Sequence, residues 1–344
     1  MAHQVTIKDL ARHLNISVAT VSRAMRDMPE IKAETRDAVL KLAKEWDYQP
    51  NLLATNLVKS RTKTIGVIVP DLAYHFFASV VKGIEEEAIA RGYSLLLTQT
   101  SELYERELTN VQNLSRGQVE GFIVSISQET TDFEHLKRLQ RKGIPLVFFD
   151  RDVDEIDVPK VMVDNVGAAY EATKHLIENG SKRIAFLAGP SNVTVSNLRQ
   201  SGYEKAIQDS GLELDETLVV HGNYNLQQAI ELTNDLFELK NPPDGLVVVS
   251  DRLALGAIAV LRKKNIRIPD DVAVVSFNDE PICSLVTPTL SSVSQPTFEM
   301  GKMAITLLIN QIENPDSLDK PEVKVFKTEL KIRESSLRIN QEAN

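Results

Sequence analysis

The sequence predicts a helix-turn-helix head over residues 1–60, with a short hinge helix at 51–59, and an α/β body of two parallel-sheet lobes over residues 61–344. Three observations support this fold class. Apolar residues recur with helical spacing before residue 50, and short apolar strands alternate with amphipathic helices from residue 65 onward. The strand series starts again near residue 161, which indicates a second lobe. Apolar strands with helical crossovers are typical of parallel sheets covered on both faces.

The helices of the head are predicted by their caps and their apolar spacing. Thr6 fits the N-cap of the first helix, whose core face follows the i, i+3, i+4, i+7 pattern. Ser17 ends the turn and caps the second helix, in which Val21 and Met25 point to the core. A third helix is expected over residues 33–46.

The outer face of the second helix carries small apolar, hydroxyl and guanidinium side chains, namely Val18, Ala19, Ser22 and Arg23. At a helix N-terminus this set suits the major groove of DNA, where a methyl group can contact a thymine methyl and an arginine can donate two hydrogen bonds to a guanine. The same residues also fit the solvated face of a generic three-helix bundle. Both interpretations stay open on these residues alone.

The segment from Asn51 to Val58 follows Pro50 and could form about two helical turns, which are unstable alone and need a partner surface. Leu57, near its end, has two interpretations of equal weight. It belongs to a patch that joins the head to the body, or it is a wedge inserted between base pairs from the minor groove. Residues 60–64 form a polar, basic linker.

Composition narrows the class of protein. No run approaches the ~20 apolar residues of a membrane span, and the N-terminus lacks the apolar core of a signal peptide, so we expect a cytoplasmic protein that does not enter a membrane. Cys283 is the single cysteine, which excludes an internal disulfide. The six histidines show no close metal-ligand spacing, so neither a metal nor a cofactor is predicted.

Charge is divided unevenly along the chain. The net charge is −9, yet residues 1–62 hold 10 Lys/Arg and 7 Asp/Glu, a net of +3. The other 282 residues hold 29 and 41, a net of −12. A basic head on an acidic body is typical of a protein that binds nucleic acid through one small domain.

The body is expected to bind a ligand where its strands end, because open α/β sheets bind ligands outside the carboxyl ends of their strands. Strands are expected at residues 65–69, 94–97, 121–124, 145–149, 161–163, 183–187, 218–220, 245–249 and 272–275. The segments just past many of them carry hydroxyl, carboxylate, guanidinium and aromatic groups: residues 71–77, 98–101, 125–127, 150–151, 192–199, 250–251 and 276–279. This chemistry suits a sugar-like ligand. Asp251 fits a helix cap as well as a ligand contact.

The head and hinge resemble those of the LacI/GalR family of bacterial repressors, in the blocks Val5–Ala11, Ser17–Arg23 and Tyr48–Asn51 and in the spacing between them. The resemblance implies that the head contacts a double-stranded DNA operator through Thr6, Ser17, Val18, Ala19, Thr20, Ser22, Arg23, Asn51, Ala54 and Leu57. Within this set Val18 and Ala19 would read base edges, and Leu57 would intercalate beside its dimer mate at a central CpG step. Arg26 stands where the family commonly has Asn, and we expect it to contact phosphate.

Residues 187–190, 250–257 and 274–279 resemble the effector domain of the same family, which is itself similar to periplasmic sugar-binding proteins. The resemblance implies effector contacts from Phe77, Asp150, Arg199, Ser250 and Asn278. Ser250 replaces a frequent Asn, and Asn278 stands where Asp is common. The expected effector is therefore a sugar, a sugar phosphate or a sugar acid.

The resemblance also implies discontinuous lobes, the first over about residues 63–160 and 292–321 and the second over about 161–291 and 322–340. No heptad-repeat tail follows, so we expect a homodimer. The expected function is transcription regulation, with repression as the first choice: the dimer binds a pseudo-palindromic operator under allosteric control by a small molecule in the interlobe cleft. The sign of that control stays open. A sugar-binding transport protein and an enzyme are the alternatives, but the chain has no signal sequence, nucleophile elbow, P-loop or zinc motif.

Overall fold

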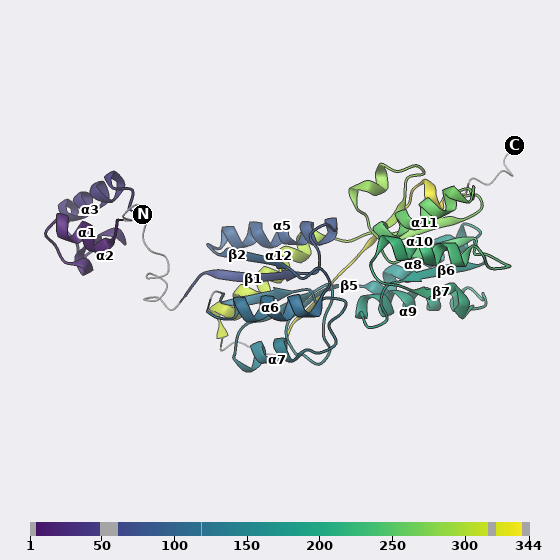
Figure 1. The fold of residues 1–344 in the computed structure, drawn as a ribbon, viewed down its shortest axis with the longest axis horizontal. Helices are drawn as coiled ribbons and strands as arrows, with labels where there is room; N and C mark the ends of the chain where they lie inside the picture. Colours follow the sequence, from purple (N-terminus) through teal and green to yellow (C-terminus); the bar gives the residue numbers. More distant parts are fainter. Residues whose placement is uncertain (1–4, 49–60, 118, 316–320, 339–344) are drawn as a thin grey trace. The chain divides into compact units, whose positions relative to one another are not determined.

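The computed structural model describes residues 5–48, 61–117, 119–315 and 321–338 (Figure 1). The chain divides into two units, Met1–Thr62 and Lys63–Asn344. The predicted fold class is confirmed, because a three-helix head precedes two α/β lobes. Residues 51–59, the predicted hinge helix with Asn51, Ala54 and Leu57, lie outside the described residues. No helix in the described ranges is long and apolar enough to cross a membrane.

The head contains α1 (Ile7–His13), α2 (Val18–Met25) and α3 (Ala33–Glu45). Thr6 caps α1 in a capping box, in which its backbone N–H and its hydroxyl both donate to the Asp9 carboxylate. Leu10 from α1, Val21 from α2 and Val39 from α3 are fully buried and meet in one small core. The predicted inward faces of α1 and α2 are therefore confirmed. On α3 the expected apolar stripe of Val39, Leu40, Leu42, Ala43 and Trp46 is wrong at Leu40, which is exposed, because it lies on the side of the helix away from α1 and α2.

The first lobe is built on a parallel sheet in the order β11-β5-β4-β3-β1-β2. Its strands are β1 (Thr64–Val69), β2 (Ser94–Gln99), β3 (Gly121–Val124), β4 (Leu146–Phe149), β5 (Lys160–Val163) and β11 (Val323–Phe326). Its helices are α5 (His75–Ala90), α6 (Tyr104–Leu114), α7 (Glu134–Arg141) and α12 (Thr297–Glu313). Alternate residues of β1 face two apolar clusters, one shared with α5 and α12 and the other with α6 and α7.

The second lobe has the order β12-β10-β9-β8-β6-β7, in which only β12 runs antiparallel to its neighbour among the described strands. Its strands are β6 (Ile184–Ala188), β7 (Val219–His221), β8 (Gly245–Val248), β9 (Ala273–Asn278), β10 (Ser291–Ser294) and β12 (Glu329–Lys331). Its helices are α8 (Asn165–Glu178), α9 (Thr194–Asp209), α10 (Leu226–Leu236) and α11 (Asp251–Lys263), with short 3₁₀ turns at Glu216–Leu218, Pro281–Ser284 and Glu334–Ser336. One large apolar core fills this lobe.

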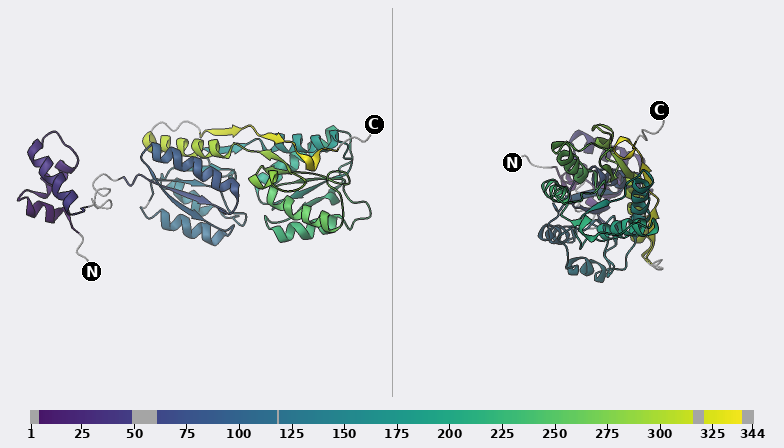
Figure 2. Two further views of the ribbon diagram at one scale, coloured as in Figure 1. Left: turned by 90° about the horizontal axis from the view of Figure 1, so that it is seen from above. Right: turned by 90° about the vertical axis from the view of Figure 1, so that its right-hand side faces the viewer.

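The chain passes between the lobes after β5, after β10 and after β11 (Figure 2). Each crossing lies a few residues later than the sequence placed it. β5 pairs with β4 and β11, so it belongs to the first lobe although the expected boundary was residue 160. β10 pairs with β9 in the second lobe. The lobe to which each short strand belongs is determined by its backbone pairing with distant strands. The apolar pattern of the sequence alone does not show this pairing.

Helices α5 and α12 approach each other closely through two glycines. A Cβ atom on Gly83 would lie 2.1 Å from the Phe298 carbonyl oxygen, and one on Gly301 would lie 2.1 Å from that of Val80. Since any side chain here would meet rigid helix backbone, glycine is required at both positions. This packing fixes α5, which carries Phe77 toward the other lobe.

Candidate nucleic-acid interface and ligand pocket

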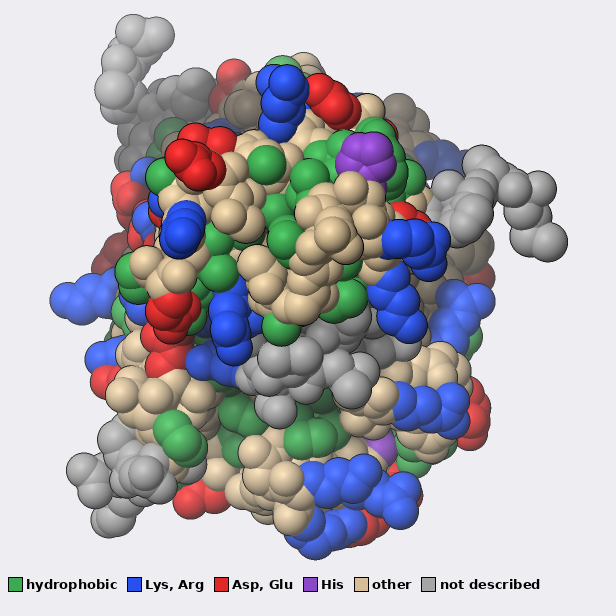
Figure 3. All heavy atoms as spheres, turned by 90° about the vertical axis from the view of Figure 1, so that its left-hand side faces the viewer, with side chains coloured by type: hydrophobic (Ala, Val, Ile, Leu, Met, Phe, Trp, Pro, Cys, Tyr) green, Lys and Arg blue, Asp and Glu red, His purple; other side chains and the backbone are tan. Residues whose placement is uncertain are grey.

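The N-terminus of α2 forms the candidate nucleic-acid interface. The Ser17 hydroxyl accepts a hydrogen bond from the Thr20 backbone N–H at 3.0 Å and pairs with the Thr20 hydroxyl at 2.8 Å. This cap orients the helix so that Val18, which is 41% exposed, and Ala19 project outward. On the face shown in Figure 3, Lys and Arg side chains lie among Asp, Glu, hydrophobic and uncharged ones.

Arg23 and Arg26 behave differently at the other end of α2. Arg26 folds back along the helix, where its Nη2 donates to the Ser22 hydroxyl at 2.8 Å and its Nε donates to the Ser22 carbonyl at 3.1 Å. The guanidinium of the exposed Arg23 makes no hydrogen bond or ion pair with any described residue. Arg23 is therefore the guanidinium of α2 that is available to a base or phosphate without breaking a contact.

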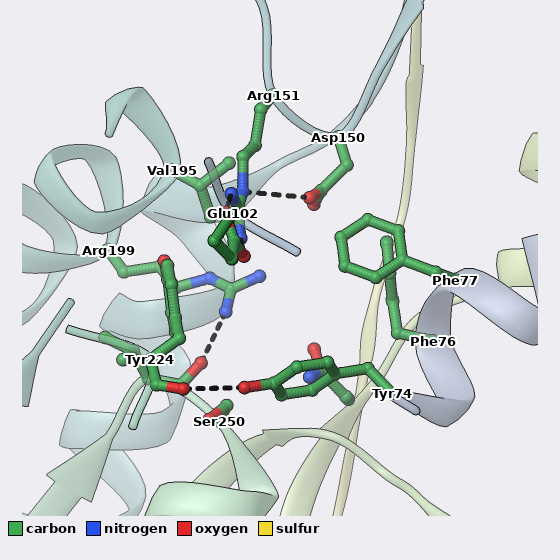
Figure 4. Close-up of a pocket in the computed structure, with 12 residues that line it drawn as sticks. Tyr74, Phe76, Phe77, Glu102, Asp150, Arg151, Val195, Arg199, Tyr224 and Ser250 are labelled. Carbon is green, nitrogen blue, oxygen red and sulfur yellow. Dashed lines mark hydrogen bonds and ion pairs between the residues drawn. The ribbon is translucent and has the colours of Figure 1, made fainter. Parts of the chain in front are cut away.

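The five residues expected to bind an effector line one pocket between the two lobes (Figure 4). Phe77 comes from α5 and Asp150 follows β4, both in the first lobe. Arg199 lies on α9, Ser250 precedes α11 and Asn278 ends β9, all in the second lobe. The other lining residues are Tyr74, Phe76, Glu102, Arg151, Val195, Tyr224 and Val249.

Arg199 is buried and held in place by two hydrogen bonds. Its Nε donates to Asn165 Oδ1 at 2.9 Å, and its Nη1 donates to the Val249 carbonyl at 2.7 Å. The guanidinium also lies over the Phe277 ring, 4.3 Å from its centroid. Burial lowers the pKa of Arg199, but an arginine stays protonated in proteins. Nη2 makes no hydrogen bond to a described residue, so it can serve a ligand.

Asp150 is the acceptor of the pocket. It adopts a left-handed backbone conformation with φ of 60°, and its nearest ion-pair partner among the described residues is the Arg151 Nε at 3.9 Å. Burial raises the pKa of the Asp150 carboxyl, and the nearby guanidinium groups of Arg151 and Arg199 oppose that rise. A buried carboxylate without a hydrogen bond favours a ligand that donates one.

The raised pKa of Asp150 predicts a pH-dependent stability difference. The folded protein binds this proton more tightly than the unfolded chain, so the contribution of Asp150 to stability is present at low pH and is lost as pH rises through the folded pKa. Asn also tolerates the left-handed conformation. Asp150→Asn should therefore raise the melting temperature at about pH 8 and change it little near pH 4.

Differential scanning calorimetry of the full chain at both pH values measures this difference. Asp154→Asn is the control, because the Asp154 side chain is 93% exposed. An equal effect of Asp150→Asn at the two pH values would contradict the assignment of a buried, ionised carboxylate at position 150.

The sequence left open whether Asp251 caps a helix or contacts a ligand, and the structure shows that Asp251 does neither. Ser250 is the N-cap of α11, where its hydroxyl accepts a hydrogen bond from the Leu253 N–H at 3.4 Å. Asp251 is fully buried outside the pocket, and its carboxylate accepts hydrogen bonds from the hydroxyls of Ser276 and Ser292. Asp251 therefore neither caps the helix nor lines the pocket, but fixes the end of β9 that carries Asn278.

Asn278 and the loop after it have an unusual backbone. Asn278 has φ of 107°, and its Oδ1 accepts a hydrogen bond from Gln295 Nε2 at 2.8 Å. The next residue, Asp279, is also left-handed and receives a hydrogen bond from Arg333 at 2.6 Å. Strained backbone held by surrounding contacts is common at ligand sites.

Seven of the described lining residues lie outside the expected effector set, and three of them, Glu102, Arg151 and Tyr224, are in contact with one another through Arg151. Glu102 lies one residue beyond the segment 98–101, and Arg151 lies within the segment 150–151 but was not selected. Tyr224 lies three residues past the end of β7, so the tendency of ligand residues to follow strand ends is the sequence signal that points to it.

A helix-turn-helix head followed by two lobes around a polar pocket defines a DNA-binding regulator that responds to a small molecule. Residues 6–51 match the family described as bacterial regulatory proteins, lacI family, and residues 62–332 match the periplasmic binding proteins and sugar binding domain of the LacI family. The chain therefore belongs to the LacI family of transcription regulators, which are DNA-binding proteins and not enzymes.

Full-length relatives agree with this assignment. The chain is 32% identical to catabolite control protein A of Priestia megaterium, over 93% of this chain and 96% of that one. It is 34% identical to the HTH-type transcriptional regulator RegA of Clostridium saccharobutylicum, over 96% and 99%. A structure of the transcriptional regulator CelR in complex with cellobiose covers 96% of this chain and 99% of that chain, with a TM-score of 0.74 and 30% identity. The Lac repressor dimer bound to operator shares the fold, with a TM-score of 0.86 at 23% identity over 98% and 100%.

Proposed function

We propose that this chain is a repressor that binds a pseudo-palindromic operator as a homodimer in the cytoplasm, and that a small sugar-like effector in the interlobe pocket sets its operator affinity. The observation that supports the proposal best is the combination of two surfaces in one chain. The head exposes Val18, Ala19 and an unpaired Arg23 at one helix, and the body gathers Asp150 and Arg199 in one pocket.

The operator contacts follow from the chemistry of α2. Val18 and Ala19 have methyl groups that can contact a thymine methyl, and the Arg23 guanidinium can donate two hydrogen bonds to a guanine or a phosphate. Ser17, Thr20 and Thr6 lie at the N-termini of α1 and α2, where hydroxyl and backbone donors suit phosphate. Ser22 acts through Arg26, which already occupies its hydroxyl. For Asn51, Ala54 and Leu57 the proposal rests on the family resemblance alone.

A homodimer is supported by an uncovered apolar edge on the first lobe. β2 is an edge strand of its sheet, and it exposes Leu96 and Leu97. Ile89, at the end of the neighbouring helix α5, is 67% exposed. Edge strands with exposed apolar side chains are normally covered by another surface. A second copy on this edge would give the two heads that a pseudo-palindromic operator requires.

Selection of bound duplexes from a random pool tests the operator proposal. The full chain should enrich an inverted repeat whose half-sites are read by α2, and the dissociation constant should rise with salt. Enrichment of a single, unrepeated half-site would overturn the dimeric mode of binding. Absence of any enriched sequence at low salt would overturn operator recognition itself.

A further inference from the structure

Arg151 lines the pocket and reaches across it. Its guanidinium lies between two aromatic rings that belong to different lobes, 5.9 Å from the ring centroid of Phe77 in the first lobe and 4.9 Å from that of Tyr224 in the second. Both distances are within the range of cation–π attraction. Arg151 therefore touches both walls of the cleft although it belongs to the first lobe only.

We propose that Arg151 determines which effector the pocket accepts, because its guanidinium occupies the place that the effector's ring must take between Phe77 and Tyr224. The proposal rests on the proposed function and deepens it. The expected effector has a ring with flat faces and hydrogen-bond donors along the ring edge. The effector molecule is uncharged or carries an amine. An anionic sugar is excluded.

The space in the pocket supports this assignment. The lining residues leave a cavity of about 40 Å³, room for a few water molecules, whereas small-molecule sites measure roughly 300–1,000 Å³. An effector therefore needs a group to move. Arg151 has a long side chain that enters the pocket from its rim, and its guanidinium donates to the Glu102 carboxylate and, at 3.1 Å, to the Ile126 carbonyl, both in the first lobe. Arg199 is held within the second lobe through its Nε and Nη1. Arg151 is the one of the two that reaches across the cleft to an aromatic ring of the other lobe.

The charges that Arg151 now balances explain why an anion is excluded. Its Nη1 and Nη2 donate to the two oxygens of Glu102 at 2.7 and 2.9 Å. Once Arg151 has left, Glu102 and Asp150 face the vacated place as acceptors, with Arg199 as the remaining cation of the pocket lining. Two carboxylates attract hydrogen-bond donors and repel a phosphate or carboxylate.

Arg151 also takes part in the contacts that keep the lobes together. The Tyr74 hydroxyl of the first lobe donates to the Tyr224 carbonyl at 2.6 Å, and Asn192 Nδ2 of the second lobe donates to the Gln128 carbonyl at 2.6 Å. Gln128 in turn donates its N–H to Glu102, the partner of Arg151. The chain's own atoms thus close the cleft, and Arg151 lies at the centre of this network.

A disulfide-trapping experiment on the full chain reports this closure without DNA or effector. Gln128→Cys and Asn192→Cys place one thiol on each side of the cleft mouth, while the native Cys283 is buried. Both substitutions are present in every variant compared, so the loss of the Asn192–Gln128 hydrogen bond is common to all of them. Crosslinking by a thiol oxidant is followed with time, at a temperature where circular dichroism shows every variant folded. Arg151→Ala should slow it about fivefold, the change expected from loss of one cation–π contact of ordinary strength. Arg138→Ala, an exposed arginine on α7, should not.

Chemical rescue then tests what the vacated place accepts. In Arg151→Ala, millimolar methylguanidinium, which is flat and donates hydrogen bonds, should restore the crosslinking rate, and methyl phosphate should not. An unchanged rate in Arg151→Ala overturns the proposal, as does failure of methylguanidinium to restore it. Rescue by methyl phosphate overturns the assigned effector class. Because Glu102 loses its partner in Arg151→Ala, the double variant Glu102→Gln/Arg151→Ala repeats the first measurement without a buried unpaired carboxylate, and it must slow crosslinking to the same extent.

The outcome is independent of the proposed function. Operator binding by the parent chain is measured separately by mobility shift. A chain that binds an operator but closes equally well without Arg151 would retain the proposed function and lose this inference. A chain that needs Arg151 for closure but binds no operator would retain this inference and lose the proposed function.

Discussion

Arg199→Ala is expected to abolish the response of operator affinity to the effector while operator affinity itself persists. The Arg199 guanidinium is buried, two of its nitrogens are fixed to Asn165 and Val249, and the third is available in the pocket. Losing one charged hydrogen bond to a ligand, with its fixed geometry, should lower effector affinity about 100-fold. Fluorescence anisotropy of a labelled operator, titrated with and without an effector found by thermal-shift screening, measures both quantities.

Arg183→Ala is the matched control for this variant. Arg183 lies in the same lobe, but its guanidinium is part-exposed and pairs with Asp215 at 2.7 Å, away from the pocket. The control should keep the full response. Since Arg199→Ala also removes two buried hydrogen bonds, calorimetry must show that the body still melts cooperatively. A full effector response in folded Arg199→Ala would show that the effector binds elsewhere.

Ala19→Glu is expected to weaken operator binding about 100-fold, because it places a carboxylate against base edges and phosphates at the N-terminus of α2. Ala19 is exposed and has no role in the core of the head, so the fold should be unchanged. The dissociation constant from mobility shift and the helical circular dichroism signal measure the two effects.

Leu40→Glu adds the same charge to the head on α3, where Leu40 is 44% exposed. It should weaken operator binding only through the change in net charge, which is a much smaller effect at physiological salt. If the two variants lost the same affinity, α2 would not be the helix that reads the operator.

The fold was predictable because its signals are local. The caps of α1 and α2 follow from Thr6 and Ser17, and the continuous apolar run of β1 places alternate side chains in two cores. The three crossings between lobes were placed a few residues too early, because the lobe of a short strand depends on which distant strand it pairs with. No local pattern in residues 160–163 or 323–326 carries that information.

The candidate pocket was predictable where one strand end supplies one residue. The rule for strand ends, with the family resemblance, located Asp150, Ser250 and Asn278 in the neighbourhood where the structure brings them together. The cross-lobe contacts of Arg151 and Tyr224 were not predictable, since they depend on how two separately folded lobes meet. Nor could the sequence show that the Asp251 side chain points away from the pocket and accepts hydrogen bonds from Ser276 and Ser292.

Ligand binding in the pocket is expected to control the affinity of the head for DNA. The most direct test is the operator dissociation constant of the full chain, with and without a small molecule that stabilises it in thermal-shift screening and fails to stabilise Arg199→Ala. We predict a change of about tenfold or more, with a reciprocal change of the same factor in effector affinity when operator is bound. A molecule that occupies the pocket and leaves the operator dissociation constant unchanged would contradict the account.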